Sequence, residues 1–296
     1  MNRLLLLIIS LLIASCGKGL VNLDEQTFQP KIVIQGTLFP HHKVDKIKIS
    51  RNFPLNTIIN NDTIVIQDAT VTIFDDTGTA YRLTFNTDTG YYEYIGTDLV
   101  IEYGKSYTLK VTATIDDREL HAKSTTTVPE AGFEILESQS VLDSMFYRER
   151  DLHGELKNFD ITFKRSPGTD FYALSLTALD ADTATFIYDN PFGDFNAEDV
   201  LDDFQDFKYT YTWIQDTPGE QGESNMEIFW FFIWFYGDYQ AIIYAADKNF
   251  KDFLQTHNEV QEIDGNFHEP AFHIEGHGIG VFGSAIADTV YFRVLK

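Results

Sequence analysis

Between residues 31 and 128 the chain alternates apolar and polar side chains with the two-residue period of β-strands. Short alternating runs are separated by polar turn sequences such as Asp75-Asp76-Thr77-Gly78 and Asp116-Asp117. The pattern predicts strands at 31–37, 44–50, 69–74, 81–86, 91–95, 106–115 and 120–128. Seven short strands separated by turns are typical of an immunoglobulin-like β-sandwich, here without the cysteine pair of antibody domains.

The pattern of residues 133–296 is less regular and predicts a second β-rich domain with one helix. We expect strands at 135–142, 159–164, 171–178, 185–189, 226–236, 271–275 and 289–294. The run 226–236 lacks polar alternation, which indicates a strand buried on both faces. Residues 239–256 predict the helix, because an apolar stripe recurs there at helical spacing: Ile242, Ala246, Phe250 and Phe253.

The first residues read as a secretory leader rather than as part of either domain. Arg3 precedes an apolar run at 4–13, which is too short to span a bilayer but has the size of a signal-peptide core. The run ends in Ile13-Ala14-Ser15-Cys16, which resembles the lipobox of bacterial lipoproteins. We therefore expect a signal peptide at 1–15, lipidation of Cys16 and a tether at 16–30. The alternative is an ordinary signal peptide with an incidental cysteine.

Composition supports a lipid anchor and excludes binding to polyanions. Cys16 is the only cysteine, so no disulfide partner competes for it. The 296 residues carry a net charge of −23, and removal of Arg3 with the leader makes it −24. A surface this acidic repels nucleic acid and anionic headgroups, so acyl chains rather than a basic patch would hold the membrane. Solubility accounts for the charge more simply than cation binding does.

Several motifs occur in the order seen in one bacterial family. They are Lys31–Gly36, Ile47–Arg51, Ala69–Ile73, Gly104–Leu109 and the closing stretch Ile274–Gly283. With the lipobox, they resemble the Bacteroidota lipoproteins of the domain-of-unknown-function 4249 family. His273 and His277 depart from the usual Asn and Gly of its ending. The resemblance implies an outer-membrane lipoprotein, often encoded beside a TonB-dependent transporter, and supplies no catalytic residue.

Three histidines near the C-terminus are the weak candidates for a metal site. His268, His273 and His277 lie close in sequence, with Glu269 and Glu275 between them. Imidazole and carboxylate are zinc ligands, but Pro270 opposes the helix that a zincin motif requires. We expect ordinary loop or strand histidines, no bound metal and no cofactor.

Two further motifs invite a ligand and are better explained by structure. Residues 278–283 match G-x-G-x-x-G, but a strand follows instead of the helix of a dinucleotide fold. The glycines therefore predict backbone turns with a positive φ or a tight bend against a sheet. The acidic stretch 194–206 could offer oxygen ligands to Ca²⁺. Its apolar residues fall at helical spacing, which favours a solvated acidic helix or ordered loop.

Aromatic residues supply the one candidate ligand surface. Trp213, Tyr211 and Tyr209 precede a polar loop and could stack against a sugar or a peptide. Trp230 and Trp234 lie in the apolar run and are expected in the core.

The combined expectation is a mostly β, non-catalytic lipoprotein of the outer membrane. It would act as an accessory or ligand-handling partner of a TonB-dependent transporter. One alternative is a structural or assembly lipoprotein facing the periplasm; the other is a metal-dependent enzyme using His268, His273 and His277. The membrane face stays open, because the first acids after Cys16 are Asp24 and Glu25.

Overall fold

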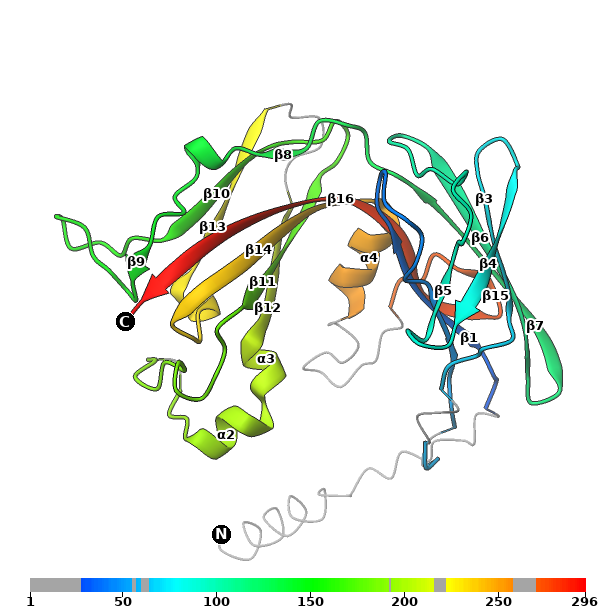
Figure 1. Ribbon diagram of the computed structural model, residues 1–296, viewed down its shortest axis with the longest axis horizontal. Coiled ribbons are helices and arrows are strands. Elements are labelled where there is room, and N and C mark those ends of the chain that lie inside the picture. Colours follow the sequence, from blue (N-terminus) through cyan, green and yellow to red (C-terminus); the bar gives the residue numbers. More distant parts are fainter. Residues whose placement is uncertain (1–27, 55–56, 60–63, 192, 216–221, 258–269) are drawn as a thin grey trace, which may run out of the picture. The chain divides into compact units, whose positions relative to one another are not determined.

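The computed structural model describes residues 28–54, 57–59, 64–191, 193–215, 222–257 and 270–296. Residues 30–52 and 58–296 form one compact unit, to which everything below refers. The predicted signal peptide, Cys16 and His268 lie outside the described residues. Strands dominate the unit and helices are few, so the predicted mostly β fold is confirmed (Figure 1).

The strands of the first half agree well with the alternating pattern. They are β1 (Ile32–Leu38), β2 (Lys48–Arg51), β3 (Thr70–Phe74), β4 (Ala80–Asn86), β5 (Tyr91–Glu93), β6 (Ser106–Ile115) and β7 (Arg118–Thr127). The strands β3 and β4 pair through the predicted turn, where Gly78 has a φ of 88°. With β15 (Glu275–Gly276), strands β3 to β7 form a six-stranded sheet in the order β15-β7-β6-β3-β4-β5.

The main sheet joins strands that are far apart in the sequence. Its path runs β12-β11-β14-β16-β1-β2, and β9 (Met145–Phe146) pairs with β16 off this path. The new members are β11 (Phe171–Ala178), β12 (Tyr209–Gln215), β14 (Gly237–Ala246) and β16 (Gly278–Leu295). A three-stranded sheet consists of β13 (Glu223–Ile228), β10 (Phe159–Lys164) and β8 (Glu134–Ile135).

The last strand, β16, takes part in both halves of the fold (Figure 1). Its first seven residues pair in parallel with β1, from Ile32 opposite Gly278 to Leu38 opposite Ser284. Its remaining length pairs antiparallel with β14. A strand from the C-terminal end of the sequence therefore completes the layer that contains β1 and β2.

Two large cores lie on the two halves of this strand. One contains residues of β1, β2 and the six-stranded sheet, including Ile34, Val71 and Leu109. The other contains residues of the main and three-stranded sheets, including Leu174, Ile243, Phe159 and Phe163. Buried aliphatic and aromatic area of this kind contributes roughly 25 cal/mol per Å² removed from water, and it is the main source of stability here.

The predicted helix at 239–256 is wrong over its first half. Residues 237–246 form strand β14, and helix α4 spans only Lys248–His257. Burial along β14 alternates from Gly237 to Ala245, with Tyr239, Ala241 and Ile243 in the core. Ile242 and Ala246 fit both periods because they are four residues apart, so a helical stripe and an even-numbered strand face cannot be told apart there.

Other predicted strands are shorter or absent. The run 226–236 breaks after Ile228 into a 3₁₀ turn, Trp230–Phe232. Phe229 and Phe231 are 41% and 42% exposed, so the prediction of one strand buried on both faces is wrong. The strand expected at 135–142 stops at Ile135. Residues 185–189 make only an isolated bridge through Phe186, and 271–275 contributes only Glu275 to a strand. Strands β10 and β11 occur as predicted.

Helix α4 is fastened to both the six-stranded sheet and β16. Its N-terminus is capped by Asp247, whose carboxylate accepts hydrogen bonds from Phe250 N at 2.9 Å, Ser284 N at 3.1 Å and Thr126 Oγ1 at 2.6 Å. Asn249 Nδ2 donates to the carbonyls of Thr125 and Phe282, each at 2.8 Å. These bonds fix where the helix crosses the sheet.

Candidate functional site: the outer face of the main sheet

Four strands of the main sheet have one face in the core and a second face that is only partly covered. Alternation places Tyr172 and Leu174 of β11 in the large core and turns the intervening residues outward. We call the second surface the outer face. Its residues are Tyr209, Tyr211 and Trp213 of β12, Ala173, Ser175 and Thr177 of β11, Gln240, Ile242 and Tyr244 of β14, and Ala287, Thr289 and Tyr291 of β16.

The registers arrange the outer face as rows across the strands. In one row Tyr211 pairs with Ser175, Ser175 with Ile242, and Ile242 with Thr289. The small residues of β11 therefore lie between larger side chains on β12 and β14. Ser175 and Thr177 of β11 are partly exposed, whereas Ala173 is buried.

The predicted ligand residues lie together on the edge strand β12. The rings of Tyr211 and Trp213 are stacked with centroids 6.4 Å apart and planes 18° apart. Tyr209 and Tyr211 are 50% and 54% exposed, so they can meet a ligand. Trp213 is less open, because it packs against the small core of Phe171 and Ala173. Phe250 and Leu254 of α4 pack on the same small core and cover that end of the face.

A pocket of 360 Å³ lies at the other side of the outer face, beside the segment that follows β1. We call it the loop pocket. Its lining is Phe39, Pro40, His42, Lys46, Tyr103, Ile242, Tyr244, Ile286, Ala287 and Thr289. The rings of Phe39 and Tyr244 lie 6.3 Å apart, and burial raises the pKa of Tyr244, so its hydroxyl remains a neutral donor at physiological pH.

Sequence reasoning missed the loop pocket. Tyr244 lies within the range predicted as a helix, and the strand β14 instead points it into the outer face. The available signal was the stretch Phe39-Pro40-His41-His42-Lys43, which places aromatic and basic residues directly after a strand. Nothing in that stretch says which sheet it will lie against.

The two described C-terminal histidines have different partners. His273 Nε2 lies 2.7 Å from Asp252 Oδ2 of α4, whereas His277 Nδ1 accepts from His121 N at 3.4 Å. Burial raises the pKa of Asp252, but hydrogen bonds from Lys248 and His273 outweigh it and hold that pKa below its usual value. Among the residues that the structure describes, no three His, Cys, Asp or Glu side chains are placed to hold a metal ion.

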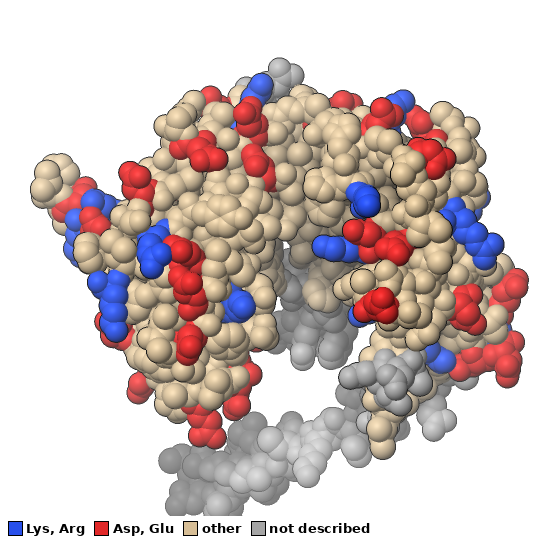
Figure 2. All heavy atoms as spheres, in the orientation of Figure 1, with Lys and Arg blue, Asp and Glu red and all other residues tan. Residues whose placement is uncertain are grey.

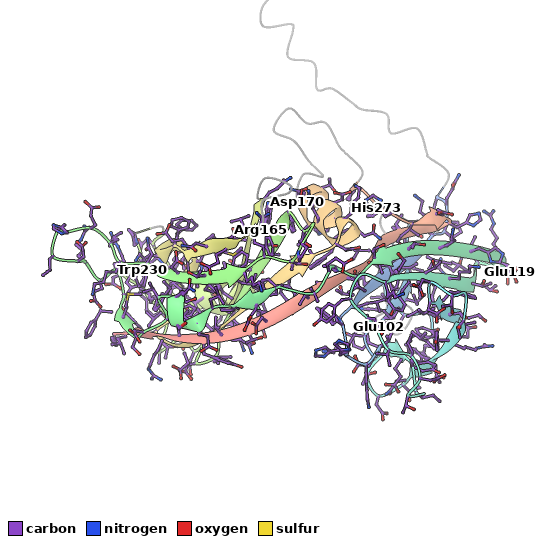
Figure 3. All side chains as sticks on the ribbon, turned by 90° about the horizontal axis from the view of Figure 1, so that it is seen from above. Glu102, Glu119, Arg165, Asp170, Trp230 and His273 are labelled. Carbon is purple, nitrogen blue, oxygen red and sulfur yellow. The ribbon has the colours of Figure 1, made fainter. Side chains whose placement is uncertain are left out.

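A hollow of 510 Å³ beside α4 contains charged residues that already pair with one another. Lys251 Nζ donates to Asp170 Oδ2 at 2.8 Å, and Lys248 pairs with Asp252. Asp170 and His273 are both labelled next to the helix in Figure 3. These pairs orient α4 and use both lysines of the hollow, so neither lysine is free to bind an anionic ligand.

The glycine motif at 278–283 lies inside strand β16, so it is not a dinucleotide loop. Gly280 has a φ of 104°, and a Cβ there would lie 2.1 Å from the carbonyl oxygen of Ile34. The predicted positive φ is found at Gly280, where β16 lies directly against β1.

The acidic segment forms two short helices, α2 (Ala197–Asp202) and α3 (Phe204–Lys208), as its spacing predicts. Asn196 and Asp199 make a reciprocal capping box at the start of α2. The carboxylate of Asp199 therefore serves to cap this helix.

The other two tryptophans are core residues, as expected. Trp230 is buried and its Nε1 donates to the carbonyl of Lys157 at 2.7 Å. Trp234 packs against the rings of Phe186, Phe195 and Phe207. Within the described ranges, no helix is both long enough and apolar enough to cross a membrane.

Comparison with known proteins identifies the family to which this chain belongs. The family model described as "Domain of unknown function (DUF4249)" matches residues 20–289. A search of curated proteins found no match.

Among solved structures, a tetra-tandem repeat from the extending region of a large adhesion protein is 10% identical with a TM-score of 0.24. It covers 90% of this chain, which spans about half (49%) of that one. A TM-score this low does not establish a common fold.

Proposed function

Because the chain belongs to the DUF4249 family, we propose that it is a lipid-anchored protein of the bacterial outer membrane that handles a ligand for a TonB-dependent transporter. The observation that carries the ligand-handling part is the outer face. A sheet whose second face keeps exposed rings on β12 and a ring-lined pocket beside β14 is suited to hold a ligand rather than to complete a core. The protein would act without catalysis.

The partner is tested by co-purification at native expression. The full protein, tagged at its C-terminus, is extracted from outer membrane in detergent and captured. We expect a β-barrel transporter to be recovered in a stoichiometric amount. Recovery of the tagged protein alone, after mild cross-linking as well as without it, would show that it does not work as a transporter partner.

Lipidation has its own test at Cys16. We expect Cys16→Ala to move the protein from the membrane fraction to the soluble fraction and to abolish incorporation of labelled palmitate, because acyl chains contribute about 0.8 kcal/mol per buried methylene. Ser15→Ala, which keeps a small residue before the cysteine, should behave as the natural protein does. Unchanged membrane attachment of the Cys16 variant would exclude the lipid as the anchor.

The membrane face separates this proposal from a periplasmic assembly role. Protease treatment of intact cells should degrade a protein exposed on the surface and spare one that faces the periplasm. Protection in intact cells, with degradation after the outer membrane is opened, would favour the assembly role.

A further inference from the structure

We propose that the loop pocket binds a small anionic molecule with a flat, ring-containing body, with Lys46 and His42 holding the anionic group and Phe39 and Tyr244 contacting the body. This names the ligand class for the ligand-handling role proposed above and rests on it. The proposal stands on the shape of the pocket, on the rings in its wall and on a local reversal of charge.

The segment that forms the outer wall is held in place. His41 N donates to the carbonyl of Ile101 at 2.8 Å, and Tyr94 N donates to the carbonyl of Val44 at 2.7 Å. The side chains of Val44 and Ile47 are buried. The backbone is therefore anchored on both sides of Lys46, while His42 and Lys46 themselves are exposed and can reach a ligand.

The interior of the pocket suits a flat apolar body. Ile242, Ile286 and Ala287 supply aliphatic surface from β14 and β16, and Thr289 adds a hydroxyl. Phe39 contacts the rings of Tyr244 and His42 at centroid distances of 6.3 and 6.2 Å. At 360 Å³ the pocket falls in the range of roughly 300–1,000 Å³ in which small-molecule sites occur.

The local charge around the pocket indicates that its ligand is anionic. The whole chain carries −23, and acidic side chains are spread over the face seen in Figure 2. Residues 41–48 reverse this balance, with three lysines and two histidines against one aspartate. Of the described residues that line the pocket, Lys46 is a basic residue, His42 offers a ring N–H donor, and none is Asp or Glu. In an otherwise acidic protein, an anion is attracted here by this local charge.

A second hollow of 340 Å³ on the other side of the same segment repeats this chemistry. Phe39, His42 and Lys46 line both hollows, and Lys43 and Asp45 are added in the second. Lys46 can thus direct its charge toward either hollow. The loop pocket is favoured because only its lining combines Phe39 with Tyr244 and the sheet.

The test compares two probes of one shape and different charge. Full-length protein in detergent is titrated calorimetrically with naphthalene-2-sulfonate, which is anionic, and with naphthalene-2-sulfonamide, which is neutral. We expect the sulfonate to bind about tenfold more tightly, and added salt to weaken only the sulfonate. Equal affinities, or no binding of either probe, would overturn the proposal.

Variants identify the residue that supplies the preference. Lys46→Gln should reduce the tenfold preference to less than about threefold, while Lys46→Arg should keep it, because the charge is retained. Lys164→Gln, which removes an exposed lysine from β10, is the matched control and should change nothing. A preference that survives Lys46→Gln combined with His42→Gln would overturn the proposal.

A third probe separates the pocket from the edge strand. Binding of a neutral oligosaccharide that is lost in Tyr211→Ser, without any response to the sulfonate, would overturn the anionic ligand and place binding on β12. Loss of sulfonate binding with the transporter still co-purifying would overturn the ligand class alone. Sulfonate binding without a co-purifying transporter would overturn the partner role alone.

Discussion

Replacement of Gly280 by alanine is expected to lower the free energy of unfolding by about 4 kcal/mol, because two costs add at this position. The backbone has a φ of 104°, which side-chain-bearing residues rarely adopt. The new Cβ would also lie 2.1 Å from Ile34 O and 3.1 Å from Ile34 C, in the parallel pairing of β1 with β16. The obstacle is backbone, so no side-chain rotation relieves it.

Gly78 provides the matched control for this substitution. It has a φ of 88° in the β3–β4 turn, and a Cβ there would meet nothing within 4 Å. We expect Gly78→Ala to cost only about 1 kcal/mol, from the backbone conformation alone. Urea unfolding of both variants measures the difference. Equal losses would mean that the close approach of β16 to β1 does not contribute.

Removal of the carboxylate of Asp247 is expected to cost about 3 kcal/mol. Asp247→Ala leaves the amides of Phe250 and Ser284 without their acceptor and removes the N-cap of α4. Thr126 Oγ1 also loses its partner at 2.6 Å, although Ser284 Oγ stays within 2.7 Å of it. Chemical unfolding measures the loss. A cost below about 1 kcal/mol would show that α4 is held by its apolar contacts instead.

Asp247→Asn is the conservative control and should retain most of the stability. Its amide oxygen can accept from the same two backbone groups, and its NH₂ can donate to Thr126 Oγ1, whose hydroxyl then turns to Ser284. Loss of stability equal to that of the alanine variant would contradict this account of the network.

The natural protein and Asp247→Asn should also differ in how their stability depends on pH. Burial raises the pKa of Asp247 above its ordinary value of 3.8, despite the hydrogen bonds that lower it. At a pH between this ordinary value and the raised pKa of the folded protein, Asp247 holds a proton in the folded protein that it has lost in the unfolded chain. The contribution of Asp247 to stability therefore falls as pH rises through that window and is constant above it. Comparison of the natural protein with Asp247→Asn between about pH 4 and 7 isolates this slope, which should vanish in the variant.

Strand alternation made the first half of the fold predictable. Residues 70–74 and 80–86 pair through the predicted turn, because a two-residue period and a glycine turn are local properties. Residues 239–246 fit the predicted helix as well as a strand, because Ile242 and Ala246 satisfy both periods. Only pairing with β11 and β16 on the two sides makes the strand the lower-energy choice.

One part of the candidate site was predictable from local sequence pattern, and the rest was not. Tyr209, Tyr211 and Trp213 share a face because they are two residues apart on one strand. The cover that α4 places over Trp213 depends on where Asp247 and Asn249 bind the sheets. The loop pocket joins residues 39–46 to residues 242–244 and 286–289, and no local pattern relates segments two hundred residues apart.

The mostly β class, the family pattern and the order of most strands were predictable from residue patterns, because alternation and turn chemistry act between near neighbours. The position of the final strand, parallel beside β1 and antiparallel beside β14, was not predictable in this way. Its glycines let β1 approach, and its outward residues complete the outer face and the loop pocket. The pairing of β16 and the formation of the loop pocket depend on hydrogen bonds and packing between segments that are distant in the sequence. Local patterns of residues do not contain this information.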